Sequence, residues 1–259
     1  MSLPDNLTQF STLVDIIARL RAPGGCPWDR KQSHAMLREC LLEECYEVLE
    51  ALDEADSDRL CLELGDLLMQ VVFHAQIASE ARVFDLADVL SGINSKLIYR
   101  HPHVFSELKV NDADEVMANW EALKAKEREA DTSMLIGVPR EMPALAYSQT
   151  VQSRVARVGF DWEDLVGVID KLAEEVRELK RAENKEQKAA EFGDLLFTLA
   201  NIARWQDIDL EAALRQANRR FFRRFSCMEE LCRKRGLSFS KLSFDEQNAL
   251  WEEAKEKVK

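Results

Sequence analysis

Two groups of acidic residues, one in each half of the chain, have the spacing of a cation-binding site. A Glu-Glu-x-x-Glu motif is followed by Glu-x-x-Asp in the first half, and the second half repeats both motifs. Residues three or four apart project from neighbouring positions on a helix, so each motif gathers its carboxylates. If the two helices of each half pack antiparallel, five carboxylates can converge on one spot. The ten candidate ligands are Glu43, Glu44, Glu47, Glu63 and Asp66, and Glu174, Glu175, Glu178, Glu191 and Asp194.

An acidic, solvated helix face is the simplest alternative explanation of the first motif in each half. The second motif argues against it, because the segment 60–75 is apolar on nearly every side of a helix, which predicts burial. Acids in a buried helix are almost never left unpaired, and two carboxylates about 4 Å apart repel by roughly 4 kcal/mol at an effective dielectric near 20. Basic residues of the same helices are too few and too far along to neutralise these acids, because Arg38 and Arg59 lie at the expected helix ends. We therefore expect a bound divalent cation.

The ligand chemistry selects the metal. All the candidate ligand atoms are oxygens, which favours Mg²⁺, with Mn²⁺ as a possible substitute, over zinc or copper. Di-iron helical bundles need Glu-x-x-His, and no histidine of this chain has a glutamate three residues before it. The six cysteines form no C-x-x-C pair and are typical of small core residues in a reducing compartment.

Polar and cationic residues recur at equal separations in both halves. Magnesium held by carboxylates mostly serves phosphate chemistry, so we expect these residues to contact phosphate or nucleotide. For any single one, a solvated helix face is the alternative, and the basic run around Arg220 would by itself fit a nucleic-acid patch. The candidates are Asn94, Arg100 and Lys124 in the first half, and Asn218, Arg220, Arg224, Trp251 and Lys255 in the second; Trp120 matches Trp251.

Helical periodicity dominates the chain and predicts an all-α fold without strands. Expected helices cover 7–21, 33–54, 58–79, 86–100, 112–130, 144–157, 164–182, 185–205, 210–234 and 244–257. Helix-start signals are Ser57, Asp85 and two capping boxes, Asn184 with Gln187 and Ser243 with Glu246. The repeated motifs indicate a duplicated helical domain: residues 1–131 and 144–259, joined by a linker over 132–143 that contains Gly137, Pro139 and Pro143.

These motifs resemble the MazG family of nucleoside triphosphate pyrophosphohydrolases. The fragments Gly25–Asp29, Arg100–Phe105 and Val158–Trp162 add to the likeness, which spans nearly the whole chain. The resemblance implies two tandem all-α NTP pyrophosphatase repeats, Mg²⁺ dependence, a homodimer, and conversion of NTP to NMP and pyrophosphate with broad base tolerance. It also implies that the C-terminal repeat is the active one. The chain departs from the family at Ala190 and Leu62, where an additional acid is common, and at Arg220, where lysine is usual.

From this site we expect Glu175, with Glu178, to orient or deprotonate the water that attacks a phosphorus. Two alternatives stay open: a related pyrophosphohydrolase acting on dUTP or phosphoribosyl-ATP, and a non-catalytic helical regulatory protein that binds nucleotides. The net charge of −12 argues against binding to nucleic acid or anionic membranes. With no signal peptide and no segment of bilayer-spanning length expected, the prediction is a cytoplasmic protein.

Overall fold

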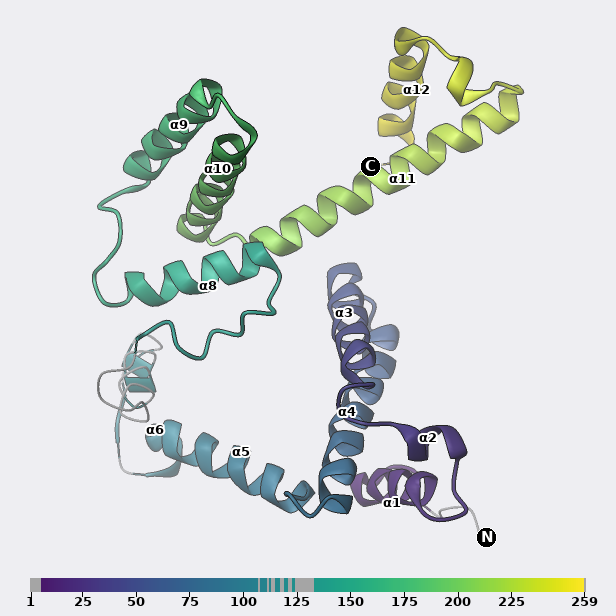
Figure 1. Ribbon diagram of the computed structural model, residues 1–259, viewed down its shortest axis with the longest axis vertical. Coiled ribbons are helices and arrows are strands. Elements are labelled where there is room, and N and C mark those ends of the chain that lie inside the picture. The colour runs from purple at the N-terminus through teal and green to yellow at the C-terminus, as the bar shows by residue number, and fades with distance from the viewer. Residues whose placement is uncertain are drawn as a thin grey trace. The chain divides into compact units, whose positions relative to one another are not determined.

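The computed structural model describes residues 6–106 and 133–258, together with 108–110, 112, 115–116, 119–120 and 123. Over these residues every regular element is helical and no strand occurs, which confirms the predicted all-α class (Figure 1). The chain divides into two compact units: unit 1 is Met1–Ala130, and unit 2 is Asp131–Lys259.

In unit 1, the long helix α4 is the element on which the others pack. The helices are α1 (Phe10–Arg21), α2 (Pro27–Lys31), α3 (Arg38–Glu54), α4 (Ser57–Glu80), α5 (Leu86–Arg100) and α6 (Pro102–Phe105). Both α3 and α1 contact α4, and the core is formed by Ile17, Leu37, Val72 and Phe73. The α3–α4 hairpin therefore brings the two acidic motifs of the first half side by side.

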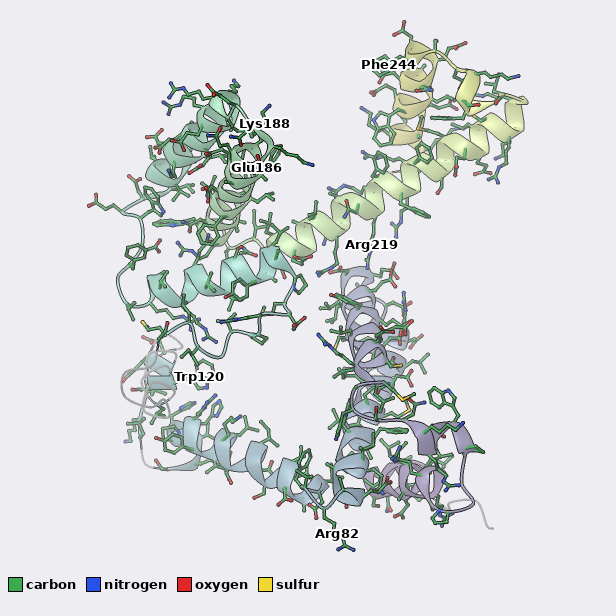
Figure 2. All side chains as sticks on the ribbon, in the orientation of Figure 1. Arg82, Trp120, Glu186, Lys188, Arg219 and Phe244 are labelled. Carbon is green, nitrogen blue, oxygen red and sulfur yellow. The ribbon has the colours of Figure 1, made fainter. Side chains whose placement is uncertain are left out.

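The end of α4 is fastened to α1 by a charged hydrogen-bond network. The guanidinium of Arg21 donates to both carboxylate oxygens of Glu80, at 2.9 and 2.7 Å, and to the backbone carbonyls of Asp29 and Gln32. The chain then turns at Arg82, which has a positive φ of 56° and an exposed side chain (Figure 2). This network fixes the segment that precedes α3 against the C-terminal end of α4.

Unit 2 contains two helical hairpins and one further helix. Its elements are α8 (Ala144–Ala156), α9 (Leu165–Arg181), α10 (Lys185–Trp205), α11 (Leu210–Arg235), the 3₁₀ turn η1 (Phe239–Lys241) and α12 (Phe244–Lys257). Helix α10 packs on α9 and α8, whereas α12 packs on α11. The core of the α11–α12 hairpin consists of Met228, Leu231, Cys232, Leu250 and Ala254.

Most predicted helix limits agree with the structure within a few residues, and local capping explains the agreement. The capping boxes Asn184 with Gln187 and Ser243 with Glu246 are confirmed, and Asp85 caps α5. Ser57 was the wrong start signal: Asp56 is the N-cap of α4, because its carboxylate accepts a hydrogen bond from the backbone N–H of Arg59. The helix expected over 112–130 lies mostly outside the described residues.

Helix α4 is less buried than its composition predicts. Leu62, Leu64, Leu68 and Val71 are exposed, and the matching face of α10 exposes Phe192 and Leu196. The expectation that no segment reaches bilayer-spanning length is also wrong, because the 24-residue α4 is long and apolar enough. A core helix of a soluble protein meets the same criterion, and α4 packs on α1 and α3. The exposed leucines indicate an apolar surface that the described helices of unit 1 leave uncovered.

Candidate active site

Three carboxylates converge between α9 and α10. Oxygens of Glu175, Glu178 and Glu191 all lie within 4.8 Å of one another. Glu175 and Glu178 are one helical turn apart on α9, and Glu191 faces them from α10. The side chain of Glu175 is only 4% exposed. Three of the five predicted ligands of the second half thus form one cluster, which we call the unit 2 cluster.

The remaining two predicted ligands lie beside this cluster. Asp194, one turn after Glu191, is near enough to act on its charge, and it lines the pocket described below. Burial raises the pKa of Glu191, and the charges of Glu178, Glu175 and Asp194 raise it further. Glu174 is turned to Lys171 and is not part of the three-residue cluster. Burial and the neighbouring acids therefore disfavour the ionised form of Glu191.

Lys171 is a site residue that the sequence analysis missed. Its ammonium lies 2.7 Å from Glu174 and 2.8 Å from Glu175, and these carboxylates raise the pKa of Lys171. The signal was present in the sequence, because a lysine three and four residues before two glutamates reaches both on a helix. Basic residues are therefore closer to the acids than predicted. The single positive charge of Lys171 is still smaller than the summed negative charge of the three carboxylates in the cluster.

A pocket of about 710 Å³ opens beside the unit 2 cluster. Glu175, Asp194 and Lys171 contribute to its wall, and most of the rest is apolar or aromatic, including Phe160, Trp162 and Phe197. A mainly apolar cavity with a few polar groups is typical of a small-molecule site. The acidic cluster and this cavity together can accommodate a molecule with a charged end and a flat apolar end.

The loop that carries Phe160 and Trp162 is fastened to the end of α10. Asp161 forms an ion pair with Arg204 and accepts hydrogen bonds from the Trp162 backbone N–H and the Trp205 indole N–H. Burial opposes ionisation of Asp161, but the hydrogen bond from Arg204 and these other contacts outweigh it and lower its pKa. The loop is thus held in place at the mouth of the pocket.

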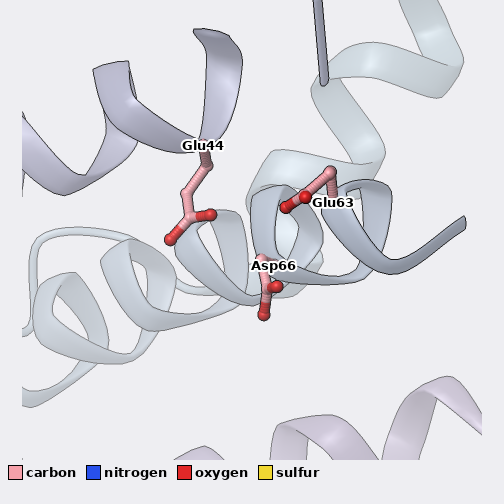
Figure 3. Close-up of side chains that lie close together, drawn as sticks. All are labelled: Glu44, Glu63 and Asp66. Carbon is pink, nitrogen blue, oxygen red and sulfur yellow. The ribbon is translucent and has the colours of Figure 1, made fainter. Parts of the chain in front are cut away.

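Unit 1 contains a second, corresponding cluster. Glu44 from α3 faces Glu63 and Asp66 from α4, with ligand oxygens within 4.8 Å of one another (Figure 3). Burial raises the pKa of Glu44, and the charges of Asp66 and Glu47 add to this, whereas a weak hydrogen bond from Gln70 opposes it. Glu43 is exposed and, like Glu47, is not one of the three. We call this group the unit 1 cluster.

Arg59 contradicts the prediction that the basic residues of unit 1 lie too far from the acids. Its guanidinium contacts Glu63 at 3.2 Å, as well as Glu50 at 2.6 Å and Glu54 at 3.2 Å. The long arginine side chain reaches Glu63 one turn along α4, so position at the helix end does not prevent the contact. The unit 1 cluster therefore already has a protein cation on one of its three carboxylates.

The predicted phosphate-contacting residues show the internal repeat at the level of side chains. The guanidinium of Arg224 lies over the Trp251 ring at 5.9 Å, and that of Arg100 lies over Trp120 at 5.5 Å. Such cation–π contacts orient the arginine side chain. Lys255, on α12, pairs with Glu252 at 2.6 Å.

Other predicted contacts are exposed on helices or lie outside the described residues. Asn218 and Arg220 are exposed on α11, and Asn94 is exposed on α5. Lys124 is outside the described residues. The residues described as lining the pocket come from α8, α9, α10 and the segments before α8 and α9, with none from α11 or α12. Within one copy of unit 2, the structure does not bring the predicted cations to the pocket.

The donor set of the unit 2 cluster fits a hard divalent cation. All its ligand atoms are carboxylate oxygens in close proximity, and these are the donors that Mg²⁺ and Mn²⁺ prefer. A dication would also relieve the repulsion that raises the pKa of Glu191. The residues therefore fit the metal that the sequence resemblance implies.

Comparison with known proteins gives matches over nearly the whole chain. Residues 32–105 match the model of the MazG nucleotide pyrophosphohydrolase domain, and residues 146–221 match that of phosphoribosyl-ATP pyrophosphohydrolase. The nucleoside triphosphate pyrophosphohydrolase/pyrophosphatase MazG of Thermotoga maritima is 46% identical, with 95% of each chain covered. The nucleoside triphosphate pyrophosphohydrolase of Escherichia coli K12 is 42% identical, with 96% of this chain and 98% of the relative covered. The chain therefore belongs to the MazG family of nucleoside triphosphate pyrophosphohydrolases.

Proposed function

We propose that this protein hydrolyses nucleoside triphosphates to nucleoside monophosphates and pyrophosphate at the unit 2 cluster, with Mg²⁺ or Mn²⁺ as cofactor. The observation that carries the proposal is the position of the three converging carboxylates beside a pocket of about 710 Å³. The pocket has the size of a small-molecule site, and its aromatic wall suits a nucleoside. Membership of the family supports the same reaction.

Glu175, Glu178, Glu191 and Asp194 are the residues proposed to hold the cation, with Glu174 beside them. When bound, the cation supplies charge neutralisation for the triphosphate and makes a water easier to deprotonate. Glu175 is the residue best placed to orient that water and accept its proton, with Glu178 assisting, because it is buried and lines the pocket. Lys171, hydrogen-bonded to Glu174, holds that carboxylate in place and offers a positive charge at the pocket wall.

The phosphate-contacting cations are proposed to come from a second copy of the chain. A triphosphate carries about four negative charges, which need cationic partners in the protein. Asn218, Arg220, Arg224, Trp251 and Lys255 lie on α11 and α12, which contribute nothing to the described pocket wall. Apolar side chains exposed on α10, such as Phe192 and Leu196, favour association with another copy. A homodimer would bring the cations of one copy to the pocket of the other and would cover the exposed apolar side chains of α10.

Unit 1 is proposed to be a helical domain that binds nucleotide or cation without comparable turnover. Its candidate contacts are Glu44, Glu63, Asp66 and Arg100, and Arg59 already occupies Glu63. The proposed domain limits are 1–131 and 144–259, with 132–143 as linker. The net charge of −12 disfavours binding to nucleic acid or anionic membranes, and the protein is proposed to be cytoplasmic.

A product assay tests the proposal. The protein is incubated with each NTP and Mg²⁺, and the products are separated by ion-exchange chromatography. Equimolar NMP and pyrophosphate are expected, and activity should disappear with EDTA and return with Mg²⁺ or Mn²⁺. Release of orthophosphate in the first step would contradict the proposed reaction.

Phosphoribosyl-ATP is a second candidate substrate, because residues 146–221 match the model of that pyrophosphohydrolase. A panel that includes phosphoribosyl-ATP and dUTP beside the common NTPs distinguishes the alternatives. Comparable kcat/KM values across the NTPs are expected, with no strong preference for phosphoribosyl-ATP or dUTP. A preference of roughly 100-fold for one of them would reassign the substrate.

A further inference from the structure

One residue that lines the unit 2 pocket has a buried polar atom without a hydrogen-bond partner in the described part of the chain. Gln152, on α8, is only 5% exposed and lines the pocket. Its side-chain Nε2 donates to the backbone carbonyl of Phe197 at 2.8 Å, whereas no partner of its Oε1 is found in the described part of the chain. The amide cannot be reversed, because the two oxygens would then face each other. Gln152 therefore presents a fixed acceptor.

An unpaired acceptor at this position is unusual enough to require an explanation. Buried amide oxygens are nearly always hydrogen-bonded, and leaving one unpaired is costly. The other glutamine of α8 follows the rule: Gln149 donates to the carbonyl of Ile208 and accepts from the N–H of Leu210. The unpaired oxygen thus belongs to the one of these two glutamines that lines the pocket.

A second carboxamide on the same wall supplies a donor. Asn201 lies one helical turn after Phe197, whose carbonyl holds Gln152, and it lines the pocket too. Its Oδ1 accepts two hydrogen bonds from Arg204, at 3.0 and 2.7 Å, so the NH₂ group points away from the arginine. No hydrogen bond of this NH₂ group is present among the described residues. These two carboxamides therefore offer one acceptor and one donor.

We infer that Gln152 and Asn201 recognise the pairing edge of the nucleobase, and that Gln152 is a specificity-determining residue that requires an N–H donor there. The inference rests on the proposed function. Every standard nucleobase carries a donor and an acceptor side by side on that edge, so one fixed acceptor and one donor accommodate all of them. The aromatic side chains of Phe160 and Trp162 are suited to contact the face of the base.

The test compares two substrates that differ in one donor. ATP carries the exocyclic amine, whereas purine riboside triphosphate has hydrogen in its place. We expect the full-length protein to hydrolyse ATP with a kcat/KM roughly tenfold higher, which corresponds to one neutral hydrogen bond. In Gln152→Met, which keeps the side-chain length but lacks the acceptor, this ratio should fall close to one.

Gln149→Met is the matched control, because it removes the same amide from the same helix outside the pocket. The ATP preference should remain in this variant. Thermal melts establish that both variants are folded, and the comparison of the two substrates in the unmodified protein does not depend on either.

Equal kcat/KM for the two substrates in the unmodified protein would overturn the role of Gln152 while leaving the proposed function intact. A preference for ATP that survives in Gln152→Met would place recognition of the amine elsewhere and would also overturn it. Failure of the unmodified protein to hydrolyse any NTP would overturn the proposed function, and the inference with it.

Discussion

The two carboxylate clusters have nearly the same framework and different cationic neighbours. In unit 2, Lys171 on α9 pairs with Glu174 and Glu175. In unit 1, Arg59 on α4 pairs with Glu63 and with two further glutamates outside the cluster. One cation therefore approaches from the first helix of the hairpin and the other from the second.

The sequence differences behind this contrast are single residues. Cys40 stands three residues before Glu43, where the second repeat has Lys171 before Glu174. Gln187 stands four residues before Glu191, where the first repeat has Arg59 before Glu63. A duplicated framework thus keeps its acids while the positions of the basic residues diverge. An arginine remains charged at all working pH values, so Arg59 competes permanently with a metal ion for Glu63.

Replacement of the central glutamate in each cluster should give the largest contrast between the units. Glu175→Gln keeps the size of the side chain and removes the charge. We expect kcat/KM for ATP to fall by roughly 100-fold or more, since both metal binding and proton acceptance are affected. Glu44→Gln, the matched change in unit 1, should reduce it by less than about threefold. Equal losses in a steady-state pyrophosphate assay would show that both units contribute to turnover.

Removal of Arg59 should make metal binding by the unit 1 cluster more like that of the unit 2 cluster. In Arg59→Gln, Glu63 loses its cationic partner, so we expect Mn²⁺ to bind unit 1 roughly tenfold more tightly. Equilibrium dialysis against Mn²⁺ measures this as an increase in the ions bound per chain at a fixed free concentration. Arg82→Gln is a suitable control, because it removes one positive charge from unit 1 at the exposed turn that follows the C-terminal end of α4. An unchanged binding curve in Arg59→Gln would mean that this arginine does not limit the site.

A smaller effect, on the free energy of unfolding, is expected from the ion pairs Arg21–Glu80 in unit 1 and Arg204–Asp161 in unit 2. Arg21 lowers the pKa of Glu80 below the ordinary value of 4.5, mainly through its hydrogen bonds to that carboxylate. The pair therefore stabilises unit 1 above pH 4.5, and this contribution is lost as the pH falls through the lower folded-state pKa. Glu80→Gln should cost about 1 kcal/mol at pH 7, allowing for solvent screening.

Chemical denaturation at several pH values measures this loss. The difference in unfolding free energy between the two proteins should shrink as the pH is lowered from 7 through the acid range. A difference independent of pH would show that shape, and not the charge of Glu80, fastens α4 to α1. The same reasoning applies in unit 2 to Asp161, whose pKa is also lowered.

Much of the fold could be predicted because its signals are local. Capping boxes such as Asn184 with Gln187 act within four residues, and apolar periodicity indicates helix extent directly. The acidic motifs are local too, so the two faces that meet in each hairpin were identifiable from spacing alone. The contacts of Arg224 with Trp251 and of Arg100 with Trp120 follow pairs that the internal repeat already matched.

The pocket could not be predicted, because its wall comes from separate segments. Gln152, Asp161 and Asn201 lie on α8, a loop and α10, and no spacing rule joins them. The degree of burial was also misjudged: α4 looks like a buried helix by composition, but burial depends on neighbours, and unit 1 leaves Leu64 and Leu68 exposed. The ion pairs of Lys171 and Arg59 could have been predicted from the sequence, since both follow helical spacing.

Crystals soaked in Mn²⁺ test the central claim most directly, because the anomalous signal of manganese locates the ion without reference to activity. We predict a strong anomalous peak within coordination distance of the carboxylates of Glu175, Glu178 and Glu191, and a weaker peak or none at Glu44, Glu63 and Asp66. Absence of a peak beside Glu175, at a concentration that supports turnover, would contradict the assignment of the unit 2 cluster as the catalytic metal site.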